Sequence, residues 1–527
     1  MIARPAPEEF TTIPALCEWT ARTYGHDTAI EDDGVTLSFI EFNALRRRIA
    51  RAFMASGLEK GDKVMIWAPN SWKWFATAMG LVSAGGVLVP CSTRFRGAEV
   101  GELIQRSRAR MIMSTGTFLD RYYPAMLTDE QRAPLHDLVV FDDAQHPDTS
   151  WEAFLARADA VEEAALEARI SSIGPDDLCD TLFTSGTTGY PKGVMYAHQQ
   201  CLRAIDGWAT RVGIERGDRI LVIPPFFHAF GYRSGALVSL MRGAVTLPHL
   251  TFDPTEILER VARDRITVIP GPPAIFHGML QSPDLKAFDT SSLRLGLTGG
   301  SVVPSTLIRR MRSELGFAGV CNGYGLTECG GYGTMCFADD PAEVIAHTAG
   351  KPMPDTEVRI RSPRGDFLRD GDPGEIVIRG YLTMKGYFEN PEATDKTIDA
   401  DGWLSTGDIG YFDAQGNLRV EDRVKDLFIT GGFNCYPAEI ERFLSAHDAV
   451  GQIAVIGVPD NRLGEVGKAF VVLRPGAQVT EAELIAWSRE NIANFKVPRS
   501  FVFLDALPTS AQGKVVKDEL RKLAGLV

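Results

Sequence analysis

Apolar residues in the first part of the chain alternate between helical and strand-like patterns. Over residues 39–56 they recur at spacings of three and four, and Ser38 with Glu41 matches a capping box, which predicts an amphipathic helix. The apolar run at 64–67 predicts a buried strand. Strict alternation of helices and strands indicates a sheet of parallel strands covered by helices. The alternation continues with helices at 72–83 and 98–106 and strands at 87–89 and 111–113.

The same alternation returns after residue 193, so we expect two α/β subdomains side by side. Between them, the acidic and alanine-rich segment 151–169 predicts a solvated helix. The second series comprises strands at 220–223, 267–269, 293–298 and 320–322 and helices at 234–241, 254–263 and 304–315.

Beyond residue 351 the pattern changes twice. Short strands at 357–360 and 375–378, separated by a turn, predict a small β-rich layer. After Arg423 the pattern is that of a compact α+β unit of about 100 residues. The predicted fold class is therefore α/β, with a large N-terminal domain of two α/β subdomains plus the β-rich layer, and a small α+β C-terminal domain. The elements of the last unit are helices at 437–445, at 481–492 and from 517, and strands at 453–458 and 469–473.

Length, charge and cysteine content narrow the class of protein. At 527 residues the chain is too long for one hydrophobic core. Its net charge of −13 disfavours a nucleic-acid partner or an anionic membrane, so a polyanionic ligand must meet local cations. The eight cysteines form no CxxC pair, which argues against a disulfide framework and a structural zinc site. With no signal segment or long apolar stretch in the sequence, we expect a cytoplasmic protein that is not inserted in a membrane.

The stretch 184–193, TSGTTGYPKG, combines glycines, hydroxyl side chains and one lysine directly after an apolar run. Glycine lets an oxyanion approach the backbone, while hydroxyls, amide N–H groups and Lys192 supply donors, so the stretch is a candidate phosphate loop. It is not a Walker A loop, because Gly193 follows the lysine where Ser or Thr would stand. The alternative is a flexible surface turn, which the position of the lysine disfavours.

Two aromatic-containing motifs follow at predicted strand ends, where open α/β sheets bind their ligands. In PFFHAFG, at 225–231, His228 is either a packed core residue or a site residue. In NGYGLTE, at 322–328, glycines flank Tyr324, which could lie flat on a base, and Glu328 follows. A carboxylate beside a phosphate loop is expected chiefly when Mg²⁺ lies between them, because two anionic groups otherwise repel.

Three polar motifs lie further along the chain. STGD, at 405–408, offers Asp408 as an acceptor for two ribose hydroxyls, or as an ordinary turn residue. DRVKD belongs to the charged run 421–426 at the predicted domain border. TSAQGK, at 509–514, puts Lys514 on a glycine-hinged loop. Taken singly, Asp408 is equally typical of an ordinary turn, whereas the charged run and Lys514 are more typical of a solvated surface.

The order and spacing of these six motifs resemble those of one family. From TSGTTGYPKG to TSAQGK, the chain is similar essentially end to end to the adenylate-forming acyl-CoA synthetases, the superfamily that also holds luciferase-type enzymes and nonribosomal adenylation domains. The joint occurrence of all six motifs is far more specific than any one of them.

The resemblance implies a nucleotide site. Tyr324 would stack on adenine beside Asn322, Asp408 and Arg423 would hold the ribose, and Glu328 with Thr184 would hold Mg²⁺. Gly300 and Ser301 would lie at the boundary of adenine and acyl group, and Gly323, Gly325 and Thr327 would complete the nucleotide motif. The loop that holds the β- and γ-phosphates of ATP would be formed by Thr184, Ser185, Gly186, Thr187, Thr188, Gly189 and Lys192.

The resemblance also implies catalytic and CoA-binding residues. Lys514 would reach the acyl carboxylate and the α-phosphate, so it rather than Lys192 would be the catalytic lysine. Lys425 matches the family's hinge, which predicts an adenylation domain at 1–424 and a mobile domain at 425–527. His228 would line and gate the acyl pocket. Gly431, Gly432 and Phe433 would lie along the CoA nucleotide, although some plant aryl-CoA ligases carry lysine at the position of Gly431.

The implied function is an ATP-dependent acid:CoA ligase that forms an acyl-adenylate and pyrophosphate and then the thioester. Residues 251–254, 265–273 and 431–434 look most like the ligases that activate the indanedione propanoate left when bacteria degrade the steroid nucleus, a form of lipid metabolism. Other bulky alicyclic, aromatic or medium-chain acids stay open. The alternatives are a stand-alone adenylation enzyme that loads a carrier protein and a non-catalytic nucleotide-binding protein. The sequence leaves a homodimer open.

Overall fold

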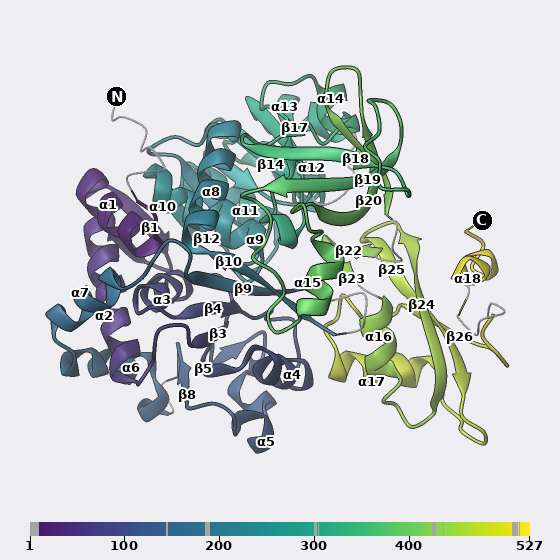
Figure 1. Cartoon of the computed structure of the whole chain (residues 1–527), viewed down its shortest axis with the longest axis horizontal. Helices are drawn as coiled ribbons and strands as arrows, with labels where there is room; N and C mark the ends of the chain where they lie inside the picture. Colours follow the sequence, from purple (N-terminus) through teal and green to yellow (C-terminus); the bar gives the residue numbers. More distant parts are fainter. Residues whose placement is uncertain are drawn as a thin grey trace.

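The computed structural model describes residues 10–143, 146–184, 190–299, 303, 305–423, 428–435, 437–508, 515 and 517–526. Figure 1 shows a large α/β body and, at one end, a smaller unit made by the last part of the chain. This arrangement confirms the predicted fold class, a large N-terminal domain followed by a small C-terminal one. Within the described residues, each helix is too short or too polar to cross a bilayer.

The first sheet of the large body has six strands in the order β10-β9-β4-β3-β5-β8. Its strands pair in parallel except for β9 and β10, as the alternating pattern predicts. The capping box of Ser38 and Glu41 begins α2 as expected. The strands are β3 (Lys63–Trp67), β4 (Val87–Pro90), β5 (Ala109–Ser114), β8 (Asp137–Val140), β9 (Leu178–Thr184) and β10 (Lys192–Ala197), and the predicted helices are α2 (Phe39–Ala55), α3 (Trp72–Ser83) and α4 (Gly97–Ser107).

The second sheet has nine strands in the order β17-β16-β15-β14-β13-β11-β12-β1-β2. Its centre is the predicted second α/β series, but the chain's first strand joins it, with Ile30 pairing in parallel with Thr246. Its strands are β1 (Thr28–Asp32), β2 (Val35–Ser38), β11 (Arg219–Val222), β12 (Val245–Pro248), β13 (Val268–Pro270), β14 (Leu295–Gly299), β15 (Gly319–Tyr324), β16 (Thr334–Met335) and β17 (Lys351–Pro352). The helices around it are α1 (Ile13–Tyr24), α8 (His198–Val212), α11 (Pro254–Arg263), α12 (Pro273–Gln281), α13 (Ser305–Ser313) and α14 (Ala342–His347).

Two predicted helices are interrupted in the structure. Segment 151–169 divides into α6 (Trp151–Ala156), η3 (Arg157–Ala160) and α7 (Glu163–Ser171), because Val161 is extended. It is also less solvated than predicted, since Trp151, Phe154 and Leu166 are buried. The segment around 234–241 comprises α9 (Ala229–Gly231), the π-helical η4 (Tyr232–Leu237) and α10 (Val238–Arg242).

The rest of the chain forms an antiparallel layer and the small C-terminal unit. The layer consists of β18 (Thr356–Arg361), β19 (Gly374–Gly380), β20 (Leu404–Phe412) and β21 (Leu418–Arg423), as the turn-rich pattern predicts. The small unit has a core of its own, which includes Phe428, Leu444 and Val471. Its elements are β22 (Phe428–Thr430), β23 (Phe433–Cys435), β24 (Val450–Asp460), β25 (Gly464–Leu473), β26 (Ser500–Phe503), α16 (Pro437–Leu444), α17 (Glu481–Asn491) and α18 (Lys517–Leu523).

Short elements complete the large body. They are β6 (Thr117–Phe118), β7 (Arg121–Tyr122), η1 (Pro124–Met126), α5 (Asp129–Arg132), η2 (Pro147–Thr149), η5 (Leu285–Ala287), η6 (Thr327–Cys329) and α15 (Pro391–Thr397).

Candidate active site

A cavity of about 3140 Å³ lies at the ends of the central strands and extends to the small C-terminal unit. Pockets for one small ligand usually measure roughly 300–1,000 Å³, so this cavity has room for several ligands. Most described residues of the sequence-predicted site line it, although they come from motifs scattered over the chain. They are Thr184, Lys192, His228, Asn322, Gly323, Tyr324, Gly325, Thr327, Glu328, Asp408, Gly431, Gly432 and Phe433.

Several predicted site residues lie wholly or partly outside the described part of the chain. The side chain of Arg423 lies outside the described part of the chain, although its backbone pairs with Asp408 across β20 and β21. The residues outside the description altogether are Ser185, Gly186, Thr187, Thr188, Gly189, Gly300, Ser301, Lys425 and Lys514.

The described ends of the candidate phosphate stretch belong to two neighbouring antiparallel strands. Thr184 ends β9 and pairs with Lys192, the first residue of β10. The sequence places Lys192 in the loop, but the structure puts it in a strand, because the apolar run that follows it pairs with β9. Its ammonium lies 4.9 Å from the centroid of the Tyr387 ring, so a cation–π contact holds the charge at the edge of the cavity.

Tyr387 joins this lysine to the predicted metal-binding acid. Its hydroxyl donates a hydrogen bond of 2.8 Å to Glu328 Oε1, while its ring faces Lys192. The Thr184 hydroxyl and the Glu328 carboxylate line the same cavity and are hard oxygen donors of the kind Mg²⁺ prefers, so the residues present fit that ion. Sequence reasoning missed Tyr387, which lies in no recognisable motif.

The predicted nucleotide-base and ribose residues are directly connected. The Tyr324 hydroxyl donates to Asp408 Oδ2 at 2.7 Å. Burial and the charge of Asp408 raise the pKa of Tyr324 well above its usual value, so this proton stays on the phenol. Asn322 donates its side-chain amide to the carbonyls of Ile345 and Thr348 at 3.0 and 3.2 Å. Its amide group therefore positions the backbone around the nucleotide motif.

His228 is exposed to the cavity, so it is not the packed core residue that its aromatic neighbours would suggest. It caps the short helix α9, where Nδ1 accepts a hydrogen bond of 3.2 Å from the Phe230 N–H. Because Nδ1 is the acceptor, the neutral imidazole carries its proton on Nε2.

A buried ion pair lies beneath the hairpin. Arg233, in η4, donates to Asp180 Oδ1 on β9 at 2.6 Å, and neither side chain is exposed. The guanidinium carbon also lies 4.1 Å from the centroid of the Tyr196 ring on β10. The pair therefore ties the phosphate hairpin to the segment that carries His228, two motifs that are unconnected in the sequence.

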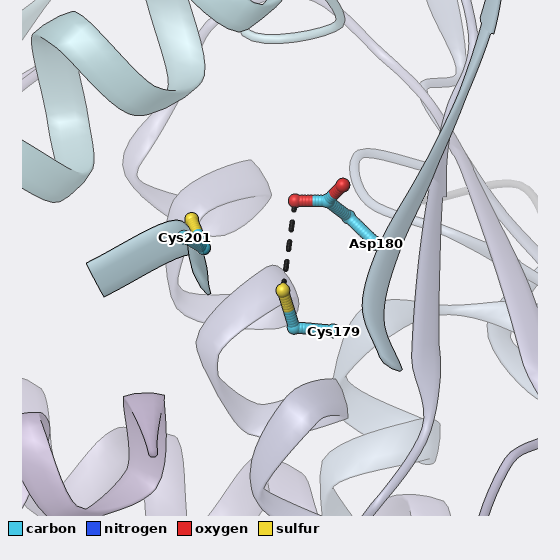
Figure 2. Close-up of side chains that lie close together, drawn as sticks. All are labelled: Cys179, Asp180 and Cys201. Carbon is cyan, nitrogen blue, oxygen red and sulfur yellow. Dashed lines mark hydrogen bonds between the residues drawn. The ribbon is translucent and has the colours of Figure 1, made fainter. Parts of the chain in front are cut away.

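Asp180 also lies near two cysteines, as Figure 2 shows. The Cys179 thiol is 3.7 Å from Asp180 Oδ2, and Cys201 lies close by on α8. Burial raises the pKa of Cys179 well above its usual value, so the thiol stays protonated, whereas metal binding requires the thiolate. Since Arg233 already balances the Asp180 charge, we interpret this cluster as part of the packed core.

The small unit contributes a tight turn and a group of arginines to the cavity. Gly431 and Gly432, with φ of 56° and 83°, form the two-residue turn between β22 and β23, a conformation that strongly favours glycine. The side chains of Arg462, Arg489 and Arg499 line the same cavity. Burial and the charges of the other two arginines lower the pKa of Arg499. Sequence reasoning missed these arginines because they belong to no recognisable local motif.

The fold is that of a two-domain α/β protein, and the candidate site lies where the central strands of its large body end. Residues 17–388 match the model of the AMP-binding enzyme family, and residues 439–514 match the model of the AMP-binding enzyme C-terminal domain. The chain therefore belongs to the AMP-binding enzyme family, which confirms the resemblance seen in its motifs.

Two relatives and one solved structure indicate which members of the family the chain resembles. The chain is 45% identical over 98% of its length, and 99% of the relative's, to a Mycobacterium tuberculosis ligase that is named for joining CoA to a methyl-dioxo-octahydroindenyl propanoyl group. It is 43% identical, over 98% and 99%, to the Rhodococcus jostii ligase of the same name. Among solved structures, o-succinylbenzoate CoA synthetase from Bacillus subtilis, bound to a product analogue, aligns with a TM-score of 0.82 at 27% identity over 96% of this chain and 98% of that one.

Proposed function

We propose that this enzyme is an acid:CoA ligase that activates an indanedione propanoate derived from the steroid nucleus. The observation that carries the proposal is the near-full-length similarity, 45% and 43%, to two ligases named for the same bicyclic propanoyl group. ATP and CoA are the co-substrates and Mg²⁺ is the cofactor.

The proposed place of the reaction is the cytoplasm, a reducing compartment, which suits eight free and buried cysteines. A homodimer is part of the same proposal and awaits a measurement of mass in solution.

The lining of the cavity supports a bulky apolar acid. Large apolar side chains stand beside the nucleotide motif and His228, and they offer contact area for a fused ring system. Those that line this part of the cavity and are partly exposed include Ile223, Phe227, Phe230 and Leu326.

The chemistry follows from charge. An oxygen of the acid attacks the α-phosphorus of ATP, the bond to pyrophosphate breaks, and the acyl-adenylate forms. Carboxylate and triphosphate repel each other, so this step needs preorganised cations and donors. Lys192, held over Tyr387, offers one such cation. Thr184 and Glu328 would hold Mg²⁺, which would supply further positive charge to the phosphates. Lys514 is the proposed lysine at the reacting carboxylate.

The second step requires a place for CoA. Its thiol sulfur attacks the acyl carbon, AMP leaves, and the thiol proton passes to solvent. In this structure the Gly431–Gly432 turn lines the cavity that contains the nucleotide motif. Arg462, Arg489 and Arg499 gather positive charge at the same cavity in a protein whose net charge is −13. Phosphate groups of CoA would relieve the repulsion among these arginines.

A panel of carboxylic acids, assayed by pyrophosphate release with and without CoA, tests the proposal. We expect the bicyclic propanoate to give the highest kcat/KM, with thioester formed only when CoA is present. A clear preference for aromatic or medium-chain acids would refute the substrate. Acyl transfer to a carrier protein in place of CoA would favour the loading enzyme. Binding of ATP without pyrophosphate release from any acid would favour a non-catalytic protein.

A further inference from the structure

A buried group of three charges joins the small C-terminal unit to the large body. Lys496 Nζ donates to Glu99 Oε1 at 3.0 Å and to Glu439 Oε1 at 2.7 Å. Glu99 lies on helix α4 of the large body, whereas Lys496 and Glu439 belong to the small unit. The side chains of all three are only 2–3% exposed.

The surroundings of the triad form a continuous contact between the two parts. Arg94 lies over the Phe433 ring, 4.1 Å from its centroid, and Lys496 lies 4.2 Å from the centroid of Phe95. Phe433 follows directly after the Gly431–Gly432 turn that lines the cavity. The segment that contains Arg94 and Glu99 therefore contacts the same face of the small unit that faces the active site.

We propose that Glu99 is a positioning residue for the CoA step, because its carboxylate, through Lys496, latches the small domain in the orientation that places the Gly431–Gly432 turn at the cavity. The inference rests on the proposed two-step function. One ammonium reaches both carboxylates only when the domains are docked in this way, so the contact is specific for one orientation.

The chemistry of the triad suits a contact that forms and breaks. When the domains separate, the three charges regain water, which offsets the loss of the Glu99–Lys496 ion pair. A wholly apolar interface of the same size would lose that compensation. Two carboxylates also share one ammonium, and among the described residues Glu439 Oε2 has no hydrogen-bond partner. The docked state is therefore not held by a fully satisfied network.

The test measures the two steps separately in Glu99→Lys, which places like charges together. Acid-dependent pyrophosphate release should stay within about twofold of the wild type, while thioester formation from supplied acyl-adenylate and CoA should fall by roughly 10- to 100-fold, the usual range for coupling between sites. Adding Lys496→Glu should restore an opposite-charge pair and recover much of the second step. Equal loss of both steps, or no recovery in the double variant, would overturn the proposal.

Two further variants separate the loss of charge from damage to the helix. Glu99 Oε2 also accepts from the Arg96 N–H, at 3.0 Å, at the start of α4. Glu99→Gln preserves an acceptor for that bond and should slow the second step less than Glu99→Lys. The matched control is Glu102→Gln on the same helix, where Glu102 pairs with Arg106; it should leave both steps unchanged. A loss in Glu102→Gln equal to that in Glu99→Gln would count against the latch.

A measurement without substrate distinguishes failure of the latch from failure of the proposed function. Because all eight native cysteines are buried, dyes can be attached to new cysteines at the exposed positions Glu59 and Glu519. Energy transfer between the dyes should fall in Glu99→Lys and recover with Lys496→Glu. Unchanged transfer in both would refute the latch even if the wild-type enzyme makes thioester. Wild-type protein that docks normally but activates no acid would refute only the function.

Discussion

At the scale of single residues, Tyr387 connects two residues of the proposed ATP site. Its hydroxyl fixes Glu328 and its ring supports Lys192. One side chain thus orders both the acid that would hold Mg²⁺ and the cation nearest the phosphate hairpin.

Tyr387→Phe should separate these two roles. The ring remains over Lys192, but the charged Glu328 carboxylate loses the hydrogen bond that the tyrosine hydroxyl donates to it. A hydrogen bond to a charged group is worth about 1.5–3 kcal/mol. We expect pyrophosphate release to fall by about 10-fold or more and the Mg²⁺ concentration needed for half-maximal rate to rise. Initial rates over a Mg²⁺ titration measure both effects. Unchanged Mg²⁺ dependence would show that this hydrogen bond does not position Glu328 for the ion.

His198 should make stability depend on pH. It is buried, and its Nδ1 accepts from the Ile13 N–H at 3.2 Å. Burial lowers its pKa from 6.5 to about 4. Between pH 6.5 and 4 this histidine is therefore protonated in the unfolded chain but neutral in the folded protein. The stability present above pH 6.5 is therefore lost as pH falls toward 4, by about 3 kcal/mol at most.

Urea unfolding at several pH values measures this dependence. His198→Asn offers an oxygen acceptor at the same place and does not titrate. Its free energy of unfolding should fall less steeply than that of the wild type between pH 6.5 and 4. Parallel curves would mean that other groups control the acid sensitivity.

At the scale of elements, the predicted helices and strands are mostly correct because hydrophobic period and capping are local properties. The helix 72–83 and the capped helix at Ser38 are examples. Strand pairing is not local. The sequence gives no sign that β1 joins the second sheet beside β12, or that Lys192 begins a strand, because both depend on partners far away or on hairpin register.

The β22–β23 hairpin carries a prediction at this scale. A Cβ on Gly432 would lie 3.3 Å from the Pro272 ring, and φ at this residue is 83°. Gly432→Ala should therefore strain the turn by about 1 kcal/mol and move it from the cavity. We expect a higher KM for CoA and little change in acid-dependent pyrophosphate release, measured by steady-state kinetics. Gly476→Ala, at a positive-φ glycine with open space around it, is the control for backbone strain alone.

At the scale of the whole molecule, the proposed mechanism has each of its two steps use a different face of the small domain. The structure places the Gly431–Gly432 turn at the cavity, an arrangement suited to the CoA step. The domain boundary at 424–425, the hinge at Lys425 and the role of Lys514 remain predictions, because these lysines lie outside the described residues.

Lys514→Ala should nearly abolish acid-dependent pyrophosphate release while sparing thioester formation from supplied acyl-adenylate. The reason is that the lysine would neutralise charge only in the first transition state. Lys425→Pro, which stiffens the proposed hinge, should show the reverse pattern. Both steps are measured in single-turnover experiments. Equal loss of both steps in Lys514→Ala would contradict the assigned role.

The amino-acid sequence by itself determined the local elements, the six motifs and, through them, the family, because each of these depends on residue types at short spacing. Only the tertiary structure decided which side chains meet. Tyr387 beneath Lys192, Arg233 on Asp180, the three arginines at the cavity and Glu99 on Lys496 join residues that are distant in the chain. Such contacts arise from packing of sheets and domains, and no pattern along one strand or helix encodes them.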